Sequence, residues 1–175
     1  MTVDQTQGTC IVYTYKAGVL SAVGHDLAIR CERFSIDIDL DDEVIEGRFD
    51  ATQLTVLGAV KNGVIVDDVL SPKDTAEILA NIRNYVLKNH QGAQIRFESD
   101  DLEIDDDTIE GDGTLTIPPR SHRVDFEADI EDGRAVCSIK LHQPDFGITP
   151  FSALMGALRI QPDILIEVDV PWPQS

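Results

Sequence analysis

Apolar and polar side chains alternate residue by residue through most of this 175-residue chain. In "FSIDIDL", which begins at Phe34, every second residue is apolar and the residues between them are serine or aspartate. The alternation returns in "TIEGDGTLTI" (108–117), "VDFEADI" (124–130) and "ILIEVDV" (164–170). Because successive side chains of a β-strand point to opposite faces, each segment has one apolar face and one polar face. The pattern is typical of antiparallel sheets that pack one face on a core.

Turn signals separate these segments, among them "NG" at 62–63, "PPR" at 118–120 and "DG" at 132–133. Many short strands joined by close turns predict a sandwich or a barrel, so the fold class is mainly β. Hydrophobic residues make up 42% of the chain, which is enough for an ordinary core. Without a repeat, a low-complexity tract or a linker, we expect residues 1–175 to form a single domain.

The segment 71–92 spaces its apolar residues as a helix does. Ser71 is a candidate N-cap, Pro72 suits the first turn, and Asp74 completes a pattern like a capping box. We predict one amphipathic helix over about 72–90. Its apolar stripe would consist of Ile78, Leu79, Ile82, Tyr85 and Val86.

A second helical pattern lies in "PFSALMGALRI", residues 150–160. Pro150 resembles a helix start, and Pro162 would block continuation of the helix. We predict a short helix over about 150–158 that caps one end of a barrel or packs across its mouth. The alternatives are a helix that seals a fully packed core and a helix buried in a dimer contact. Its apolar stripe would consist of Phe151, Leu154, Met155 and Leu158.

The chain is strongly acidic, with 32 acidic and 14 basic residues and a net charge of −18. Nucleic acids and anionic membrane surfaces are negatively charged, so this balance argues against both as partners. No run of 18 apolar residues occurs, which predicts that the chain has no integral membrane segment.

The first ten residues contain neither a basic region nor an apolar run, so no secretory signal is visible. The cysteines Cys10, Cys31 and Cys137 are odd in number and widely spaced, which indicates free thiols. Both features predict a cytoplasmic protein. A periplasmic location would require that a leader had been removed.

His25 and Asp26, in "VGHDLAI", are the pair most like a catalytic pair. Adjacent side chains on a strand point to opposite faces, so the two are poorly placed to act as a dyad. A half-buried structural histidine, or a polar group that contacts the head of a ligand in an apolar lumen, fits the pattern better. The histidines lack metal-ligand spacing and no nucleotide-binding motif occurs, so we predict neither a metal site nor a cofactor.

Several segments, in their order along the chain, resemble the YceI-like family of lipocalin-like barrels. They are "VGHDLAI", the long helix that leads into "QIRFES", the hairpin "GDGTLTIPPRSHRVDFEADI", and "KLHQPDFGI", and together they span roughly residues 10–170. The resemblance implies an antiparallel up-and-down β-barrel with a long apolar lumen open at one end. It also implies an association with polyisoprenoids and other long amphiphiles, and it brings no catalytic motif.

We therefore predict a non-enzymatic protein that binds a long apolar or amphiphilic molecule in the barrel lumen, such as a polyisoprenoid, a quinone or a fatty-acid-like lipid. Gly111, Gly113 and Ala128 are small residues at strand positions that we expect to face the interior, and they favour space for such a ligand. One alternative is an enzyme of the hydrolase or isomerase type that uses His25. The other is a filled structural barrel that acts through dimerisation, and a homodimer is compatible with each of these functions.

The alternation along each strand predicts which side chains face the interior, and we call the two alternating sets of positions the inward and the outward parity. The expected interior residues are Tyr13, Phe34, Ile36, Ile38, Phe49, Phe97, Leu115, Phe126 and Ile166. The expected ligand contacts are His25, Tyr13, Phe34, Phe97, Phe126, Phe146, Phe151, Leu154, Met155 and Leu158.

Overall fold

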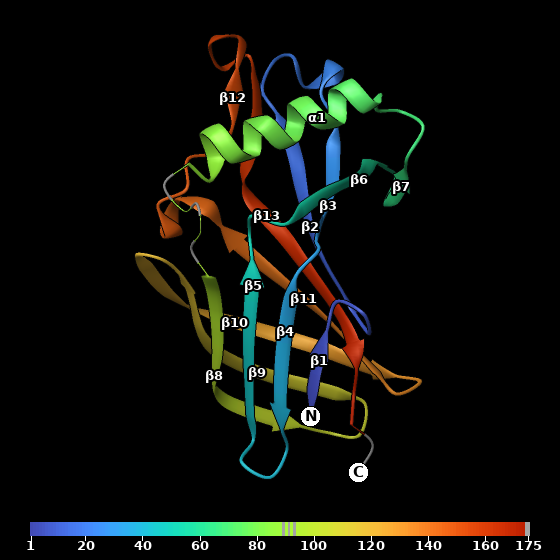
Figure 1. Ribbon diagram of the computed structural model, residues 1–175, viewed down its shortest axis with the longest axis vertical. Helices are drawn as coiled ribbons and strands as arrows, with labels where there is room; N and C mark the ends of the chain where they lie inside the picture. The colour runs from blue at the N-terminus through green and yellow to red at the C-terminus, as the bar shows by residue number, and fades with distance from the viewer. Residues whose placement is uncertain (89, 91, 93, 174–175) are drawn as a thin grey trace.

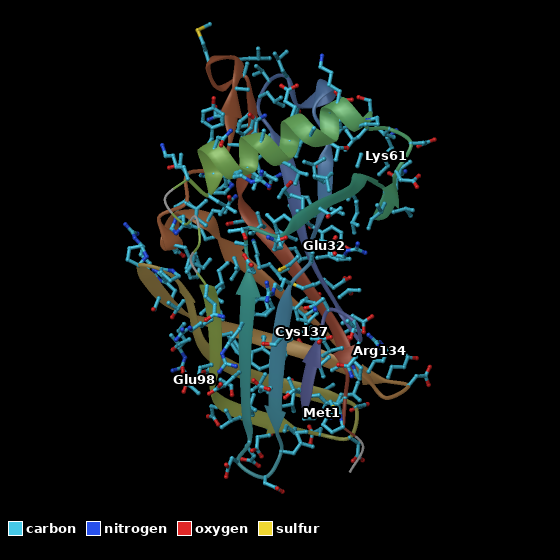
Figure 2. All side chains as sticks on the ribbon, in the orientation of Figure 1. Met1, Glu32, Lys61, Glu98, Arg134 and Cys137 are labelled. Carbon is cyan, nitrogen blue, oxygen red and sulfur yellow. The ribbon has the colours of Figure 1, made fainter. Side chains whose placement is uncertain are left out.

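The computed structural model describes residues 1–88, 90, 92 and 94–173. Over these residues, thirteen β-strands form one antiparallel sheet, which Figure 1 shows as a tall, strongly curved wall. The strands are β1 (Thr2–Asp4), β2 (Thr9–Ala17), β3 (Asp26–Cys31), β4 (Phe34–Asp39), β5 (Val44–Asp50), β6 (Leu54–Lys61), β7 (Val64–Val66), β8 (Gln94–Ile104), β9 (Thr108–Ile117), β10 (Arg120–Glu131), β11 (Arg134–His142), β12 (Ser152–Ala153) and β13 (Leu158–Pro171). Short 3₁₀ turns lie at Ser21–Val23 (η1), Gln143–Phe146 (η3) and Leu154–Gly156 (η4).

Several strands of the sheet continue one another along the height of the barrel. β3 runs into β4 and β5 runs into β6, and these two long strands pair as a single hairpin. Two backbone bonds cross the breaks: Glu32 N–H donates to the Gln53 carbonyl at 2.7 Å, and Asp50 N–H donates to the Arg33 carbonyl at 3.0 Å. β1 and β2 lie end to end along the β3–β4 strand.

The order then runs β5, β8, β9, β10, β11 and β13, and β13 pairs back onto β2. Every pairing is antiparallel, so the predicted up-and-down barrel is confirmed. Closure of this kind removes the unpaired edges that invite aggregation. Beyond Asp50, however, the β5–β6 strand leaves β8 and pairs with β7, so the wall is incomplete at that end.

A packed cluster closes the end of the barrel where both termini lie (Figure 1). Val3 is fully buried, and the Phe34 ring stacks on the Phe49 ring with 6.0 Å between centroids. Trp172 packs against this cluster and against a second one around Ile109. We call this end the floor; its buried members are Val3, Cys10, Cys31, Phe34, Ile36, Ile38, Val168 and Val170.

Helix α1 (Pro72–Asn81) lies across the opposite end, which we call the helix end (Figure 1). It begins with the predicted capping box, in which Ser71 Oγ accepts from Asp74 N–H at 3.2 Å and Asp74 Oδ2 accepts from Ser71 N–H at 2.9 Å. A π-helical turn, Ile82–Val86, continues it, so the helix ends before the predicted residue 90. Among the described residues, no helix is long and apolar enough to cross a membrane.

The predicted second helix at 150–158 is wrong. The segment forms a hairpin, in which β12 and the start of β13 pair Ala153 with Leu158. β13 then pairs Arg159 with Ala17 and makes a bulge around Pro162 before it continues. Over nine residues the helical spacing of apolar residues also fits a hairpin, and pairing with β2 satisfies backbone groups that a lone helix would expose.

Candidate functional site

A cavity of about 780 Å³ fills the barrel between the floor and α1. Apolar side chains from the barrel strands and from α1 form nearly all of its wall. The exposed side chains of this wall, Asp74 and Glu77 on α1 and Arg159 on β13, all lie at the helix end and mark the mouth. The volume falls in the range of about 300–1,000 Å³ that is typical of ligand pockets.

Glycines in β9 shape one side of the wall. A Cβ atom on Gly113 would lie 2.7 Å from the Phe97 ring, and one on Gly111 would lie 3.1 Å from the Phe126 ring. The two rings meet edge to face, with 5.5 Å between centroids. The space that inward-facing glycines leave is therefore taken by two aromatic rings, and these rings line the cavity.

A few polar groups face this apolar lumen. Lys16 Nζ donates to the Gly24 carbonyl at 3.1 Å, and Gln143 Nε2 donates to the Gln161 carbonyl at 3.0 Å. The Thr14 hydroxyl is buried and has no hydrogen-bond partner among the described residues. Buried polar groups are normally satisfied, so Thr14 offers a bound molecule one hydrogen bond.

His25 lines the cavity, whereas the Asp26 carboxylate accepts a hydrogen bond from Lys16 N–H at 2.7 Å. The predicted inward histidine without an Asp26 dyad is confirmed. Hydrogen bonds from Ser71 hold the pKa of Asp74 below its usual value, and the charges of Lys73 and His25 act in the same direction. The residues described contain no cluster of three His, Cys, Asp or Glu side chains suited to a metal ion.

Three free thiols also line the cavity, as predicted for free cysteines. Cys10 and Cys31 lie on neighbouring strands, and a hydrogen bond between their thiols raises the pKa of Cys10 and lowers the pKa of Cys31. Burial raises the pKa of the Cys137 thiol to about 12. A thiol with so high a pKa is a poor nucleophile near neutral pH.

Half of the predicted ligand contacts lie in the cavity wall: His25, Phe97, Phe126, Phe151 and Leu158. Most of the predicted interior residues are there too, namely Ile36, Ile38, Phe49, Leu115 and Ile166. Phe34 has the predicted inward parity, but it is buried in the floor behind Phe49 and does not line the cavity.

The structure contradicts the placement of four further residues, so that with Phe34 five of the ten expected ligand contacts lie outside the wall. Tyr13 points outward, where its hydroxyl donates to Glu167 at 3.5 Å, because Val12 and Thr14 take the inward parity. Phe146 is buried behind the wall, edge-on to the His122 ring. Leu154 and Met155 lie on the exposed tip of the hairpin.

Sequence reasoning missed several cavity residues. Ile78 on α1 and Ile82 in the π-helical turn face the lumen, and their apolar stripe was the signal that could have identified them. Thr14, Lys16 and Gln143 gave no such signal, because they are polar: Thr14 and Lys16 share the inward face of β2 with Val12, and Gln143 follows the end of β11.

The architecture matches solved structures that share little sequence with this chain. BcnA of Burkholderia cenocepacia matches with a TM-score of 0.63 at 10% identity, over 96% of this chain and 98% of that one. The YceI protein of Campylobacter jejuni and a mutant of it match with TM-scores of 0.50 and 0.51, at 15% and 16% identity, over 83% of this chain and 85% of theirs. No family model and no curated protein matches the sequence. The fold is nevertheless YceI-like, as the segment order predicted.

Proposed function

We propose that this YceI-like barrel binds a long apolar or amphiphilic molecule in its cavity without changing it chemically. The observation that carries the proposal is a cavity of about 780 Å³ with an apolar wall. A filled barrel would have side chains in this space. Candidate ligands are a polyisoprenoid, a quinone or a fatty-acid-like lipid, since each has a tail that matches the wall.

The hydrophobic effect would supply most of the affinity. Burial of apolar surface contributes about 25 cal/mol per Å², so about 300 Å² of tail would contribute about 7 kcal/mol before the loss of ligand freedom is subtracted. This contribution is non-directional, so it discriminates poorly between tails of similar length. Selection would come from the head group near Lys16, His25 and Arg159, whose side chains lie in the wall toward the mouth.

Two substitutions on one strand test the proposal. Ile139 lines the cavity from β11, whereas Val136 on the same strand is 38% exposed on the outer face. We expect Ile139→Trp to fill part of the lumen and to weaken the binding of a fluorescent long-chain fatty acid at least tenfold. Val136→Trp, the matched control, should bind the probe as the wild type does.

Equal affinities for the two variants would overturn the proposal. Mass spectrometry of the gently purified protein should in addition show a co-purified lipid. If a substrate were instead turned over and His25→Ala abolished turnover while the probe still bound, the protein would be an enzyme that uses His25.

A further inference from the structure

Two loops form an exposed apolar projection at the helix end. Val19 and Leu20, between β2 and β3, are 88% and 40% exposed, and Leu154 and Met155 in η4 are 62% exposed and fully exposed. Leu20 N–H donates to the Ala157 carbonyl at 2.9 Å, so the two loops lie side by side. In Figure 1 both loops rise beyond α1 at the end of the long axis. We call these four side chains the apolar tip.

The backbone of the apolar tip is strained where its largest side chains stand. Leu154 and Met155 have φ angles of +52° and +55°, a region that bulky residues seldom adopt. Glycine, asparagine or aspartate would relax such a turn and would also suit water. Two large apolar side chains in this conformation, facing solvent, are an outlier of the kind found at functional sites.

The charge of the chain is segregated away from the apolar tip. The protein has 32 acidic residues, yet residues 5–25 and residues 146–162 contain no Asp or Glu and carry one base each, Lys16 and Arg159. These two segments supply both loops of the tip and adjoin each other through the pairing of Arg159 with Ala17. The two loops of the apolar tip therefore carry no acidic residue themselves, whereas Asp74 and Glu77 at the mouth belong to α1.

We propose that the apolar tip inserts into the surface of an uncharged lipid bilayer and thereby sets the mouth of the cavity against the membrane. A fluid bilayer can accommodate a small convex apolar projection of any shape, whereas a protein partner would need a complementary concave surface. Stable protein interfaces bury at least about 1,200 Å² in total, more than four side chains on two loops supply. The two loops carry no carboxylate that insertion would have to desolvate, and a bilayer without net charge does not repel the acids elsewhere in the protein.

The apolar tip is continuous with the cavity. Leu158 and Arg159 follow η4 after one intervening residue and line the wall. The centroid of the Phe151 ring lies 6.4 Å from that of the Tyr85 ring in the π-helical turn. An apolar ligand would thus have a path from the membrane to the lumen along the apolar side chains of Phe151 and Leu158. Insertion does not depend on an occupied cavity, whereas this transfer role rests on the proposed function.

Vesicle flotation with phosphatidylcholine vesicles tests the proposal. We expect the wild type to float with the vesicles and Met155→Asp and Leu154→Asp to lower its partition at least tenfold each. Aspartate tolerates positive φ, so both variants should fold. Val64→Asp is the matched control, since Val64 on the separate β6–β7 hairpin is 63% exposed, and it should float as the wild type does.

Vesicles that contain phosphatidylserine should bind the wild type less well, because the protein carries a net charge of −18. The proposal is wrong if the wild type does not float, or if the tip variants float as well as Val64→Asp. It is also wrong if the wild type is a dimer in solution that Met155→Asp separates, because the tip would then contact a second copy. Fatty-acid probe binding without vesicles tests the lumen separately, so the loss of either activity can be assigned to its own site.

Discussion

The two ends of the barrel are held by different means. At the floor, Val3 is fully buried and Phe34 is 4% exposed, and backbone bonds tie Met1 to Ile38 and Trp172 to Gly133. At the helix end, none of the described residues of α1 or of its π-helical turn is buried, and Tyr85 is 61% exposed. The apolar stripe of α1 lines the cavity, so part of it faces the lumen instead of other side chains of the barrel.

This difference separates stability from function. The floor supplies close-packed contacts, which hold the barrel together whether or not a ligand is present. The helix end has few such contacts, and elements of this kind open at a lower free energy than the global unfolding free energy. We therefore expect α1 to open for ligand entry while the floor remains folded.

The largest effect should come from the floor. Phe34→Ala removes a buried ring and its stacking on Phe49, and we expect it to lower the free energy of unfolding by about 3–5 kcal/mol. Tyr85→Ala at the helix end should lower it by less than about 1 kcal/mol, since the ring is mostly exposed. Urea unfolding measures both. Similar losses in the two variants would show that the ends are equally packed.

A smaller loss of stability, with a larger loss of binding, should follow Ile82→Ala. Ile82 is half-buried over Leu27, Ile29 and Val56 and lines the cavity. We expect about 1–2 kcal/mol of destabilisation and roughly fivefold weaker binding of the fatty-acid probe, because truncation removes apolar contact with the ligand.

Ile65→Ala serves as the control for Ile82→Ala. Ile65 is 36% exposed on β7, outside the cavity wall, and its truncation should leave probe binding unchanged. If Ile82→Ala were as destabilising as Phe34→Ala, α1 would belong to the core and would not act as a cover.

The same contrast explains what the sequence could predict. Strands such as β4 and β10 alternate strictly, so their inward residues, Ile36 and Phe126 among them, follow from parity. In β2 both parities carry apolar residues, and the choice of Val12 over Tyr13 is made by pairing with β3 and β13. The floor was thus largely predictable, because most of its strands have one apolar face and one polar face.

The helix end was less predictable, because tertiary pairing decides it. The hairpin at 150–160 forms only because β2 lies beside it, and nothing local distinguishes it from a short helix. The capping box of α1 was predicted correctly, since Ser71 and Asp74 interact locally. Its position over the cavity depends on where the β5–β6 strand leaves β8, which no local pattern encodes.

A local effect should follow Ser71→Ala, which removes the N-cap of α1. We expect the helix to lose about 1 kcal/mol, so its amides should exchange with solvent roughly fivefold faster while floor amides stay unchanged. The pKa of Asp74 is lower in the folded protein than in the unfolded chain. The stability that the Ser71–Asp74 hydrogen bonds contribute is therefore present at pH values above the unfolded pKa, and it is lost as pH falls through the folded pKa. Hydrogen exchange measures the effect, and equal acceleration at the floor would mean that α1 and the floor unfold together.

The smallest expected effect concerns Cys137, which packs against the floor cluster. Its pKa is raised to about 12 by burial, whereas an exposed thiol has a pKa near 8.5. A thiol whose pKa is raised on folding stabilises the folded state. This contribution is complete at pH values below the pKa of the thiol in the unfolded chain, and it is lost as pH rises from about 8.5 toward 12. Between pH 7.5 and pH 9, the wild type should therefore lose about 0.8 kcal/mol more than Cys137→Ala. Urea unfolding of both proteins at the two pH values measures this difference, which cancels the titration of all other groups. Equal losses of unfolding free energy in the two proteins would show that water reaches Cys137 in the folded state. The floor would then be as accessible to water as the helix end.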